Sequence, residues 1–215
     1  MKRILIVNAT PKRDGVCYSF VQAAKETTEA LGVEADVLDL STYGLNKCLM
    51  CNDGWGICRT EHKCIMGEKD GFSKLQQRVA RADAFVYATP VYWGDTSEEL
   101  KIFWDRLRRC EATKQGNGKD DVNSVHKGKP SIIVAVAGGG GGGIVTAFLN
   151  MERTINHMCY NDPYDHSTGL VFDYFAINRW NQDYKREAFK AAIAEMVAIK
   201  RGEKKPPRYV TSVVK

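Results

Sequence analysis

Four of the chain's seven cysteines lie close together in the stretch CLMCNDGWGICRTEHKC. They are spaced C-x2-C-x6-C-x5-C, at positions Cys48, Cys51, Cys58 and Cys64. Clustered thiolates can hold an iron–sulfur cluster or a zinc ion, form disulfides, or work as redox-active thiols. The choice among these depends on the cellular compartment and on the fold that carries the cysteines.

The bulk composition is that of an ordinary globular protein. The chain has 215 residues and a formal net charge of +5. Its start, MKRILIVNAT, has an apolar run too short for a signal peptide, and no segment reaches the length of a membrane span. We therefore expect a cytoplasmic protein, in which clustered cysteines are more often metal-binding or redox-active than disulfide-bonded. No basic stripe is interleaved with aromatic residues, which argues against a nucleic-acid partner.

Strand-like and helix-like segments alternate along the chain. Apolar strands are expected at 3–9, 33–40, 84–89, 131–137 and 168–175. Helical spacing of apolar residues is found at 17–31, 71–82, 97–110, 144–158 and 183–201, and a polar loop at 112–129. This alternation, with strands apolar on both faces, predicts an α/β fold, a doubly wound parallel sheet of five strands in the flavodoxin-like order 2-1-3-4-5. We place one domain at 1–202, with a cysteine-rich insertion at 41–70 after the second strand and a basic tail at 203–215.

In such a fold, ligands bind outside the carboxyl ends of the strands, where the strand order reverses. The first turn there, NATPKRDGVCYS at 8–19, offers the Thr10 hydroxyl, the cations Lys12 and Arg13, a glycine and the amides of a helix start. A phosphate needs these groups. The spacing is not that of a nucleotide triphosphatase loop. The alternative is a plain strand–helix turn with surface cations.

Two further turns leave the same edge of the predicted sheet. TPVYWGD at 89–95 places adjacent aromatics after a strand, where they form a wall for a flat ring or pack on a helix or a second subunit. AGGGGGG at 137–143 lets the main chain approach a ligand closely, or is a mobile loop. Its match to the dinucleotide fingerprint means little, because any six-glycine run matches. A phosphate socket, an aromatic wall and a bare main-chain ledge together indicate FMN.

These segments also carry a resemblance. NATPKRDGVCYS, TPVYWG, the following KIFWDRL and the glycine run resemble the NADPH-dependent FMN reductase and iron–sulfur flavoprotein family of flavodoxin-like proteins, from residue 1 to about 160. The chain departs from the family pattern at Thr10, where Ser is usual, at Lys12, where Arg is usual, and at Val16, where Asn is usual. Lysine keeps the charge but lacks the bidentate fork of arginine, and valine leaves only its amide.

The resemblance implies which residues hold FMN. The residues expected around the phosphate are Thr10, Lys12, Gly15, Val16 and Cys17. The residues expected along the isoalloxazine ring are Pro90, Val91, Tyr92, Trp93, Gly94, Ala137, Gly138, Gly139 and Gly140. We nominate no catalytic acid or base, because the flavin itself carries the redox chemistry.

Iron–sulfur members of this family carry a compact cysteine motif after strand 2, with the first three cysteines two residues apart. Here the pair Cys48–Cys51 fits, but the gap to Cys58 is wider and contains glycines that let the chain fold back. The resemblance implies a [4Fe–4S] cluster on Cys48, Cys51, Cys58 and Cys64. The alternatives are zinc, with His62 in place of one thiolate, and free thiols or a disulfide. Cys110 and Cys159 are expected to be small buried hydrophobes on helices.

The expected activity follows from FMN. We expect an oxidoreductase that passes electrons from NAD(P)H or a reduced carrier to a quinone, a flavin, a nitro compound or an iron–sulfur acceptor, either a small molecule or a protein. The resemblance implies a homodimer or homotetramer. A non-enzymatic flavodoxin-like electron carrier is one alternative, although the charge of +5 speaks against it, since such carriers dock through acidic surfaces. A zinc-binding module that senses redox state is the other.

Overall fold

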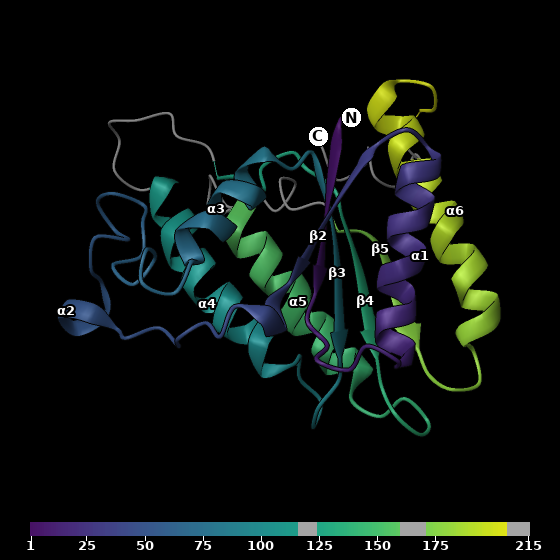
Figure 1. Cartoon of the computed structure of the whole chain (residues 1–215), viewed down its shortest axis with the longest axis horizontal. Helices are drawn as coiled ribbons and strands as arrows, with labels where there is room; N and C mark the ends of the chain where they lie inside the picture. The colour runs from purple at the N-terminus through teal and green to yellow at the C-terminus, as the bar shows by residue number, and fades with distance from the viewer. Residues whose placement is uncertain (116–123, 160–170, 206–215) are drawn as a thin grey trace.

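The sheet has five parallel strands. The computed structural model describes residues 1–115, 124–159 and 171–205 (Figure 1). The strands are β1 (Arg3–Asn8), β2 (Glu34–Asp39), β3 (Ala84–Pro90), β4 (Ser131–Val136) and β5 (Val171–Ile177). All neighbours pair in parallel, in the order β2-β1-β3-β4-β5. The predicted flavodoxin-like order is therefore confirmed.

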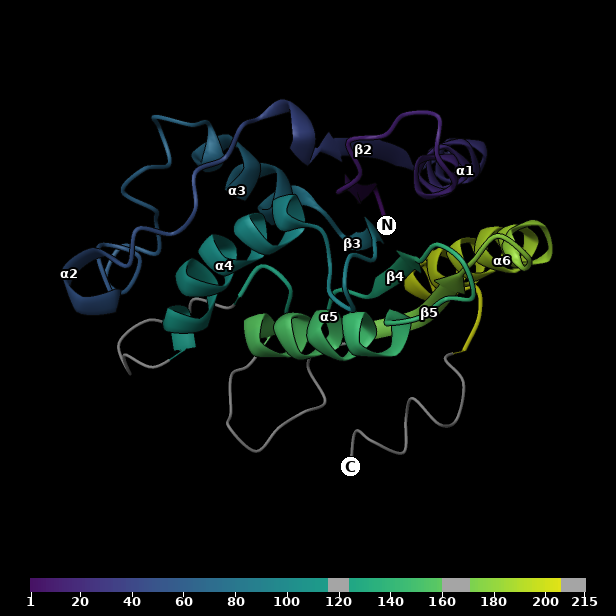
Figure 2. The same cartoon turned by 90° about the horizontal axis from the view of Figure 1, so that it is seen from below.

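Helices cover both faces of this sheet. The five long helices are α1 (Val16–Ala30), α3 (Phe72–Arg81), α4 (Glu98–Ala112), α5 (Ile144–Cys159) and α6 (Gln182–Arg201). Figure 2 shows α1 and α6 on one face and α3, α4 and α5 on the other. Three short helices, α2 (Cys51–Gly54), η1 (Leu40–Thr42) and η2 (Thr113–Gln115), complete the described elements. None of the helices in these ranges is long and apolar enough to cross a membrane.

The strand sequences explain the two layers of core. In β1, Leu5 and Val7 belong to the core cluster under α3, α4 and α5, whereas Ile4 and Ile6 belong to the cluster under α1 and α6. All four side chains are fully buried. Since successive strand residues point to opposite faces, a strand covered on both sides must be apolar throughout. That requirement made the apolar runs readable as strands.

The last strand ends later than predicted, at Ile177 rather than at residue 175. It pairs with β4 as far as Val136 and Ile177, so it reaches the same edge of the sheet as its neighbours. The predicted residues 168–170 of this strand lie outside the described residues, as do 116–123 of the predicted polar loop and 206–215 of the predicted basic tail.

Residues 41–70 contain the clustered cysteines, and we call them the cysteine loop. After the last two residues of η1, this loop holds only the short helix α2. In Figure 1 the loop extends to the left, beyond α4 and away from the sheet, while the turns after β1, β3 and β4 gather at the bottom. The two groups of candidate residues therefore occupy different parts of the molecule.

Candidate functional site

Three turns leave the carboxyl edge of the sheet side by side. Main-chain hydrogen bonds continue the sheet pairing into each of them. Ala9 N donates to Ala88 O at 2.9 Å, Val91 N to Val136 O at 2.8 Å, and Ala137 N to Ile177 O at 3.0 Å. The turns predicted to share a ligand are thus brought together by the strands themselves.

The turn after β1 is organised by two polar side chains. Asn8 accepts from Thr10 N at 3.1 Å and donates to Thr10 O at 3.2 Å, which closes the turn on itself. The Thr10 hydroxyl accepts from Lys12 N at 3.3 Å. Both Asn8 and Thr10 are buried. Asn8 was not among the predicted site residues, although an Asn at a strand end is a recognised turn signal.

The start of α1 suits a phosphate. Gly15 is the N-cap residue and supplies no side-chain cap, and the first turn carries no acidic residue. The amides of Val16 and Cys17 are therefore free of the partners that usually satisfy a helix start. The Cys17 side chain packs into the core, and burial raises the pKa of its thiol to about 12. Only its main chain faces the turn, which excludes a reactive thiol there.

The two cations of this turn are placed differently. Lys12 is exposed, with its Nζ 3.9 Å from a carboxylate oxygen of Asp14. Arg13 instead forms an ion pair with Asp39 and lies over the ring of Tyr18. Lys12 is therefore the cation that remains available to a phosphate at the start of α1.

The turn after β3 is a tight hairpin. Tyr92 and Asp95 exchange two main-chain hydrogen bonds, of 2.9 and 3.0 Å. The two residues between them, Trp93 and Gly94, have φ of 52° and 81°, as a type I′ turn requires. Trp93 is a fully exposed indole at the tip, and Tyr92 is 52% exposed. Two large aromatic surfaces are thus offered to solvent at the edge of the sheet.

The glycine run touches this hairpin. A β-carbon on residue 143 would stand 2.5 Å from the Cα of Gly94, so the two main chains meet without room for a side chain. Over Gly138, Gly139 and Gly142, by contrast, a β-carbon would meet nothing within 4 Å. The run is therefore an open main-chain ledge anchored at one end against the aromatic hairpin, and it fits a flat ring system.

Two polar groups outside the predicted set tie the turns together. Ser97, the N-cap of α4, donates to Ala9 O at 2.8 Å, while its own amide donates to the Thr89 hydroxyl at 3.0 Å. Both side chains are fully buried. A Ser directly before two glutamates is an N-cap signal, so the sequence held the information that would have identified Ser97.

Asp95 fixes the aromatic hairpin to the helices. Its carboxylate accepts from Lys101 Nζ at 2.8 Å and from Asn150 Nδ2 at 3.1 Å, which links the hairpin to α4 and α5. Burial acts to raise the pKa of Asp95, but these hydrogen bonds and one from the Thr96 amide outweigh it, and the pKa is lowered. The hairpin is therefore held by a carboxylate that stays ionised.

The cysteine loop forms a separate pocket against α4. All four clustered cysteines line it, together with Cys110 of α4. Cys110 is buried as expected, and burial raises the pKa of its thiol. Its place beside the other cysteines depends on how the loop packs on α4, so it could not be foreseen. The six cysteines whose side chains the structure describes form no disulfide.

Arg106 joins the cysteine loop to α4. Its guanidinium donates to Cys64 Sγ at 3.3 and 3.2 Å and to Asn46 O at 3.0 Å, and it pairs with Asp70. The Arg106 and Asp70 side chains are almost fully buried. A buried charge pair of this kind fixes position, because either charge alone would be left without a partner.

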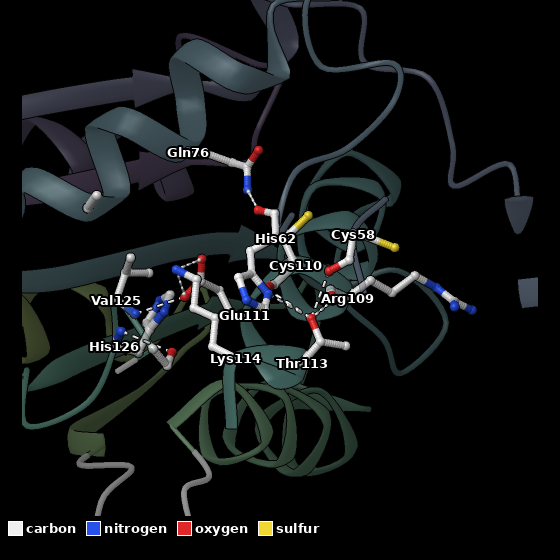
Figure 3. A network of polar contacts seen from close by, with 12 residues as sticks. Cys58, His62, Gln76, Arg109, Cys110, Glu111, Thr113, Lys114, Val125 and His126 are labelled. Carbon is white, nitrogen blue, oxygen red and sulfur yellow. Dashed lines mark hydrogen bonds and ion pairs between the residues drawn. The ribbon is translucent and has the colours of Figure 1, made fainter. Parts of the chain in front are cut away.

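A second set of contacts holds the loop at the far end of α4 (Figure 3). The Thr113 hydroxyl donates to Cys58 O at 2.7 Å and lies 3.2 Å from His62 Nδ1. Gln76 of α3 donates to His62 O at 3.3 Å. The His62 ring is therefore engaged with α4 rather than presented to the cysteines.

The cysteine pocket does not fit a metal centre in this arrangement. Within the described residues, no three Cys, His, Asp or Glu side chains stand close enough to hold a metal ion. Cys64 faces the Arg106 guanidinium instead. The structure thus gives no support to a cluster or a zinc ion, and the predicted ligands Cys48, Cys51, Cys58 and Cys64 stay a prediction.

The model of the family described as NADPH-dependent FMN reductase matches residues 2–162. The chain belongs to this family. The predicted NADPH-dependent FMN reductase membership is thereby confirmed, and the match includes all three turns at the edge of the sheet. It also includes the cysteine loop.

Relatives named iron–sulfur flavoproteins also match this chain. An iron–sulfur flavoprotein from Methanocaldococcus jannaschii is 27% identical over 106 residues, which cover 49% of this chain and 52% of the relative. The chain spans about half the length of the curated relatives it matches. This chain and these relatives therefore share a region of about 110 residues.

Solved structures share the fold. An FMN-dependent NADH-azoreductase from Bacillus anthracis superposes with a TM-score of 0.63 at 12% identity, covering 91% of this chain and 99% of the other. An NAD(P)H:quinone oxidoreductase from Methanothermobacter marburgensis gives 0.60 at 17% identity, covering 93% and 97%. At such identities the likeness establishes the flavodoxin-like fold of this chain.

Proposed function

We propose that this chain is an FMN-dependent oxidoreductase that takes electrons from NAD(P)H and delivers them to a small-molecule acceptor such as a quinone. One observation carries the proposal. A helix start without a cap and an open glycine ledge lie at the same edge of the sheet, in a chain of the NADPH-dependent FMN reductase family. The first suits a phosphate and the second a flat ring.

In this proposal the turn after β1 holds the FMN phosphate. Hydrogen bonds come from the Thr10 hydroxyl and from the amides of Gly15, Val16 and Cys17. Positive charge comes from the Lys12 ammonium. The buried hydrogen bonds of Asn8 keep the turn in shape before the ligand arrives. Such preorganisation lowers the entropy lost on binding.

The other two turns hold the ring. One side of the ring site is formed by the turn after β3, with Pro90, Val91, Tyr92, Trp93 and Gly94. The other side is formed by the turn after β4, with Ala137, Gly138, Gly139 and Gly140. A bound FMN would supply the redox chemistry between NAD(P)H and the acceptor. The chain's own residues bind and orient the ring and exclude water from one side of it.

Assembly is a further part of the proposal. Trp93 at the tip of the hairpin is fully exposed, and Val145 and Leu149, one helical turn apart on α5, are largely exposed. Thr146, between them, approaches Gly94 of the hairpin. An apolar surface at the rim of the ring site suits a second copy of the chain, and we propose a homodimer or homotetramer.

The [4Fe–4S] cluster stays a separate proposal for the cysteine loop, with zinc as its alternative. The names of the curated relatives favour the cluster, while the described arrangement of the cysteines does not fit it. No electron-transfer step proposed here runs through the cysteines. A cytoplasmic location likewise stays an expectation.

Anaerobic stopped-flow absorption tests the function. FMN-loaded protein is mixed with NADPH or NADH, and the flavin band is followed before and after a quinone is added. We expect rapid bleaching by a dinucleotide and recovery with the quinone. Bleaching by dithionite but by neither dinucleotide would contradict the proposal and leave a non-enzymatic electron carrier. Failure to bind FMN at all would contradict both.

A further inference from the structure

The turn after β5 borders the glycine ledge from the side opposite the aromatic hairpin. A β-carbon on Gly140 would meet only Trp180, whose Cζ3 atom would be 3.8 Å away. A β-carbon on Gly141 would lie 3.5 Å from Nδ2 of Asn178. Neither Asn178 nor Trp180 was singled out from the sequence. The ledge is thus flanked by exposed aromatics on two sides.

The turn that carries Trp180 is rigid. Asn178 N donates to Asn181 Oδ1 at 2.8 Å, and Trp180 N donates to Asn178 Oδ1 at 2.9 Å. Asn181 Nδ2 in turn donates to Ala176 O at 3.0 Å, at the end of β5. Nevertheless Trp180 remains 65% exposed. The turn thus fixes the main chain of Trp180 and leaves its indole open to solvent, where a flat ring can stack on it.

Cations accompany the aromatics of this turn. The guanidinium carbon of Arg179 lies 4.4 Å from the centre of the Trp180 ring, and Lys185 Nζ lies 5.8 Å from the ring of the exposed Tyr184. Asp183 is the exposed anion in the same stretch. Stacking occupies the flat face of a guanidinium and leaves its N–H edge for a phosphate, which it can bind with two parallel hydrogen bonds.

The phosphate of FMN cannot serve both this turn and the turn after β1. Strands β1 and β5 are separated by β3 and β4. With neighbouring strands about 4.8 Å apart, the two turns start roughly 14 Å from one another. The aromatic and cationic groups after β5 therefore suit a second ligand that reaches the ledge from the other side.

We propose that Arg179 and Trp180 form the subsite for the adenosine end of the dinucleotide donor. Trp180 stacks on the adenine, and Arg179 binds the 2′-phosphate that distinguishes NADPH from NADH. This inference rests on the proposed function, because it names residues that select the donor. It makes Arg179 a specificity-determining residue of the same site.

Calorimetric titration of the FMN-loaded full chain tests the subsite without electron transfer. The probes are adenosine 2′,5′-bisphosphate and adenosine 5′-phosphate. We expect Arg179→Gln to weaken the bisphosphate about tenfold and the monophosphate less than about twofold, because one charge-assisted contact to the extra phosphate is lost. Trp180→Ala weakens both probes and Trp180→Phe restores most of the loss. Arg153→Gln, which removes an exposed arginine of α5, is the matched control and binds both probes as the wild type does.

Steady-state kinetics supply a second readout. Arg179→Gln raises KM for NADPH about tenfold, keeps kcat, and leaves KM for NADH unchanged. The inference is overturned if the variant binds the bisphosphate like the wild type, if it loses both probes equally, or if the wild type binds neither probe. Failure of the wild type to be reduced by either dinucleotide would instead refute the proposed function, and the titration separates the two cases.

Discussion

The carboxyl edge of the sheet and the cysteine loop are positioned by different means. At the edge, main-chain hydrogen bonds extend the sheet into the turns, and most residues with positive φ are glycines. In the cysteine loop, side chains make the connections to α4, and Met50, Asn52, Asp53 and His62 all have positive φ. The left-handed conformation costs about 1–2 kcal/mol for a residue such as Met50, and less for Asn and Asp.

The edge of the sheet is therefore a preformed site, whereas the shape of the cysteine loop depends on a few side-chain contacts. The turns at the edge need no rearrangement to accept a flat ring, because the strands already hold them together. The cysteine loop stores backbone strain and depends on a few polar contacts with α4. Strain of this kind is kept where the surroundings enforce it and often marks a segment that changes on binding. The comparison therefore predicts that damage to one region leaves the other intact.

The largest effect is expected at Arg106. Arg106→Leu leaves the Asp70 carboxylate buried without its partner and frees Cys64 and Asn46. We expect the free energy of unfolding in urea to fall by about 3–5 kcal/mol. Because the edge is remote, FMN affinity of the folded protein should stay within about twofold. The half-buried Arg108 on the same helix provides the control, and Arg108→Leu should cost far less. Loss of FMN binding by Arg106→Leu would contradict the independence of the two regions.

Gly143→Ala should damage the FMN site at the edge of the sheet and leave the cysteine loop intact. The added β-carbon would collide with Gly94 and require a left-handed conformation, since φ of Gly143 is 82°. We expect FMN binding, measured by quenching of flavin fluorescence, to weaken about a hundredfold or more because the ledge is displaced from the hairpin. Gly202→Ala is the matched control, with a φ of 76° and nothing within 4 Å of the new atom. Equal loss of FMN binding in both variants would mean that the collision is not the cause.

Ser97→Ala tests whether Ser97 links the turns after β1 and β3 at the edge of the sheet. The change removes the N-cap of α4 and the hydrogen bond to Ala9 O. We expect the free energy of unfolding to fall by about 1–2 kcal/mol, and FMN to bind more weakly, since the turns after β1 and β3 lose their link. Ser41→Ala, at an exposed position in η1, should change neither quantity. An unchanged FMN affinity in Ser97→Ala would show that Ser97 does not support the FMN site.

A pH dependence of the cysteine loop follows from the pairing of Asp70 with Arg106. Burial acts to raise the pKa of Asp70, but hydrogen bonds from Arg106 and from Asn46 outweigh it and lower the pKa to about 2. A depressed carboxyl pKa stabilises the fold above the unfolded value, near pH 4, and this stabilisation is lost as the pH falls toward 2. We expect Asp70→Asn to flatten this part of the stability profile. A profile that keeps its acid slope in the variant would assign the slope to other carboxylates.

The sequence predicted the edge of the sheet well because its signals are local. Apolar runs such as that of β1 mark strands buried on both faces, and the turns after β1, β3 and β4 stand directly behind them. Strand order then brings these turns together. The N-cap pattern of Ser97 is also local, but it does not show that the hydroxyl reaches Ala9 O in another turn.

Other features could not be read from neighbouring residues. Asn178 marks a turn after β5, but the position of Trp180 beside Gly140 arises only from the pairing of β4 with β5. Cys110 meets the cysteine loop only because Arg106 and Thr113 fasten that loop to α4. The spacing of four cysteines predicts a shared pocket, but the arrangement within it depends on contacts from distant segments.

A crystal structure of the chain with FMN tests the central claim most directly. The account predicts one FMN per chain, with its phosphate at Thr10 and the Val16 amide and its ring over Gly138 to Gly140, beside the aromatic hairpin. An FMN bound elsewhere, or a ring that contacts neither the hairpin nor the glycine ledge, would contradict it.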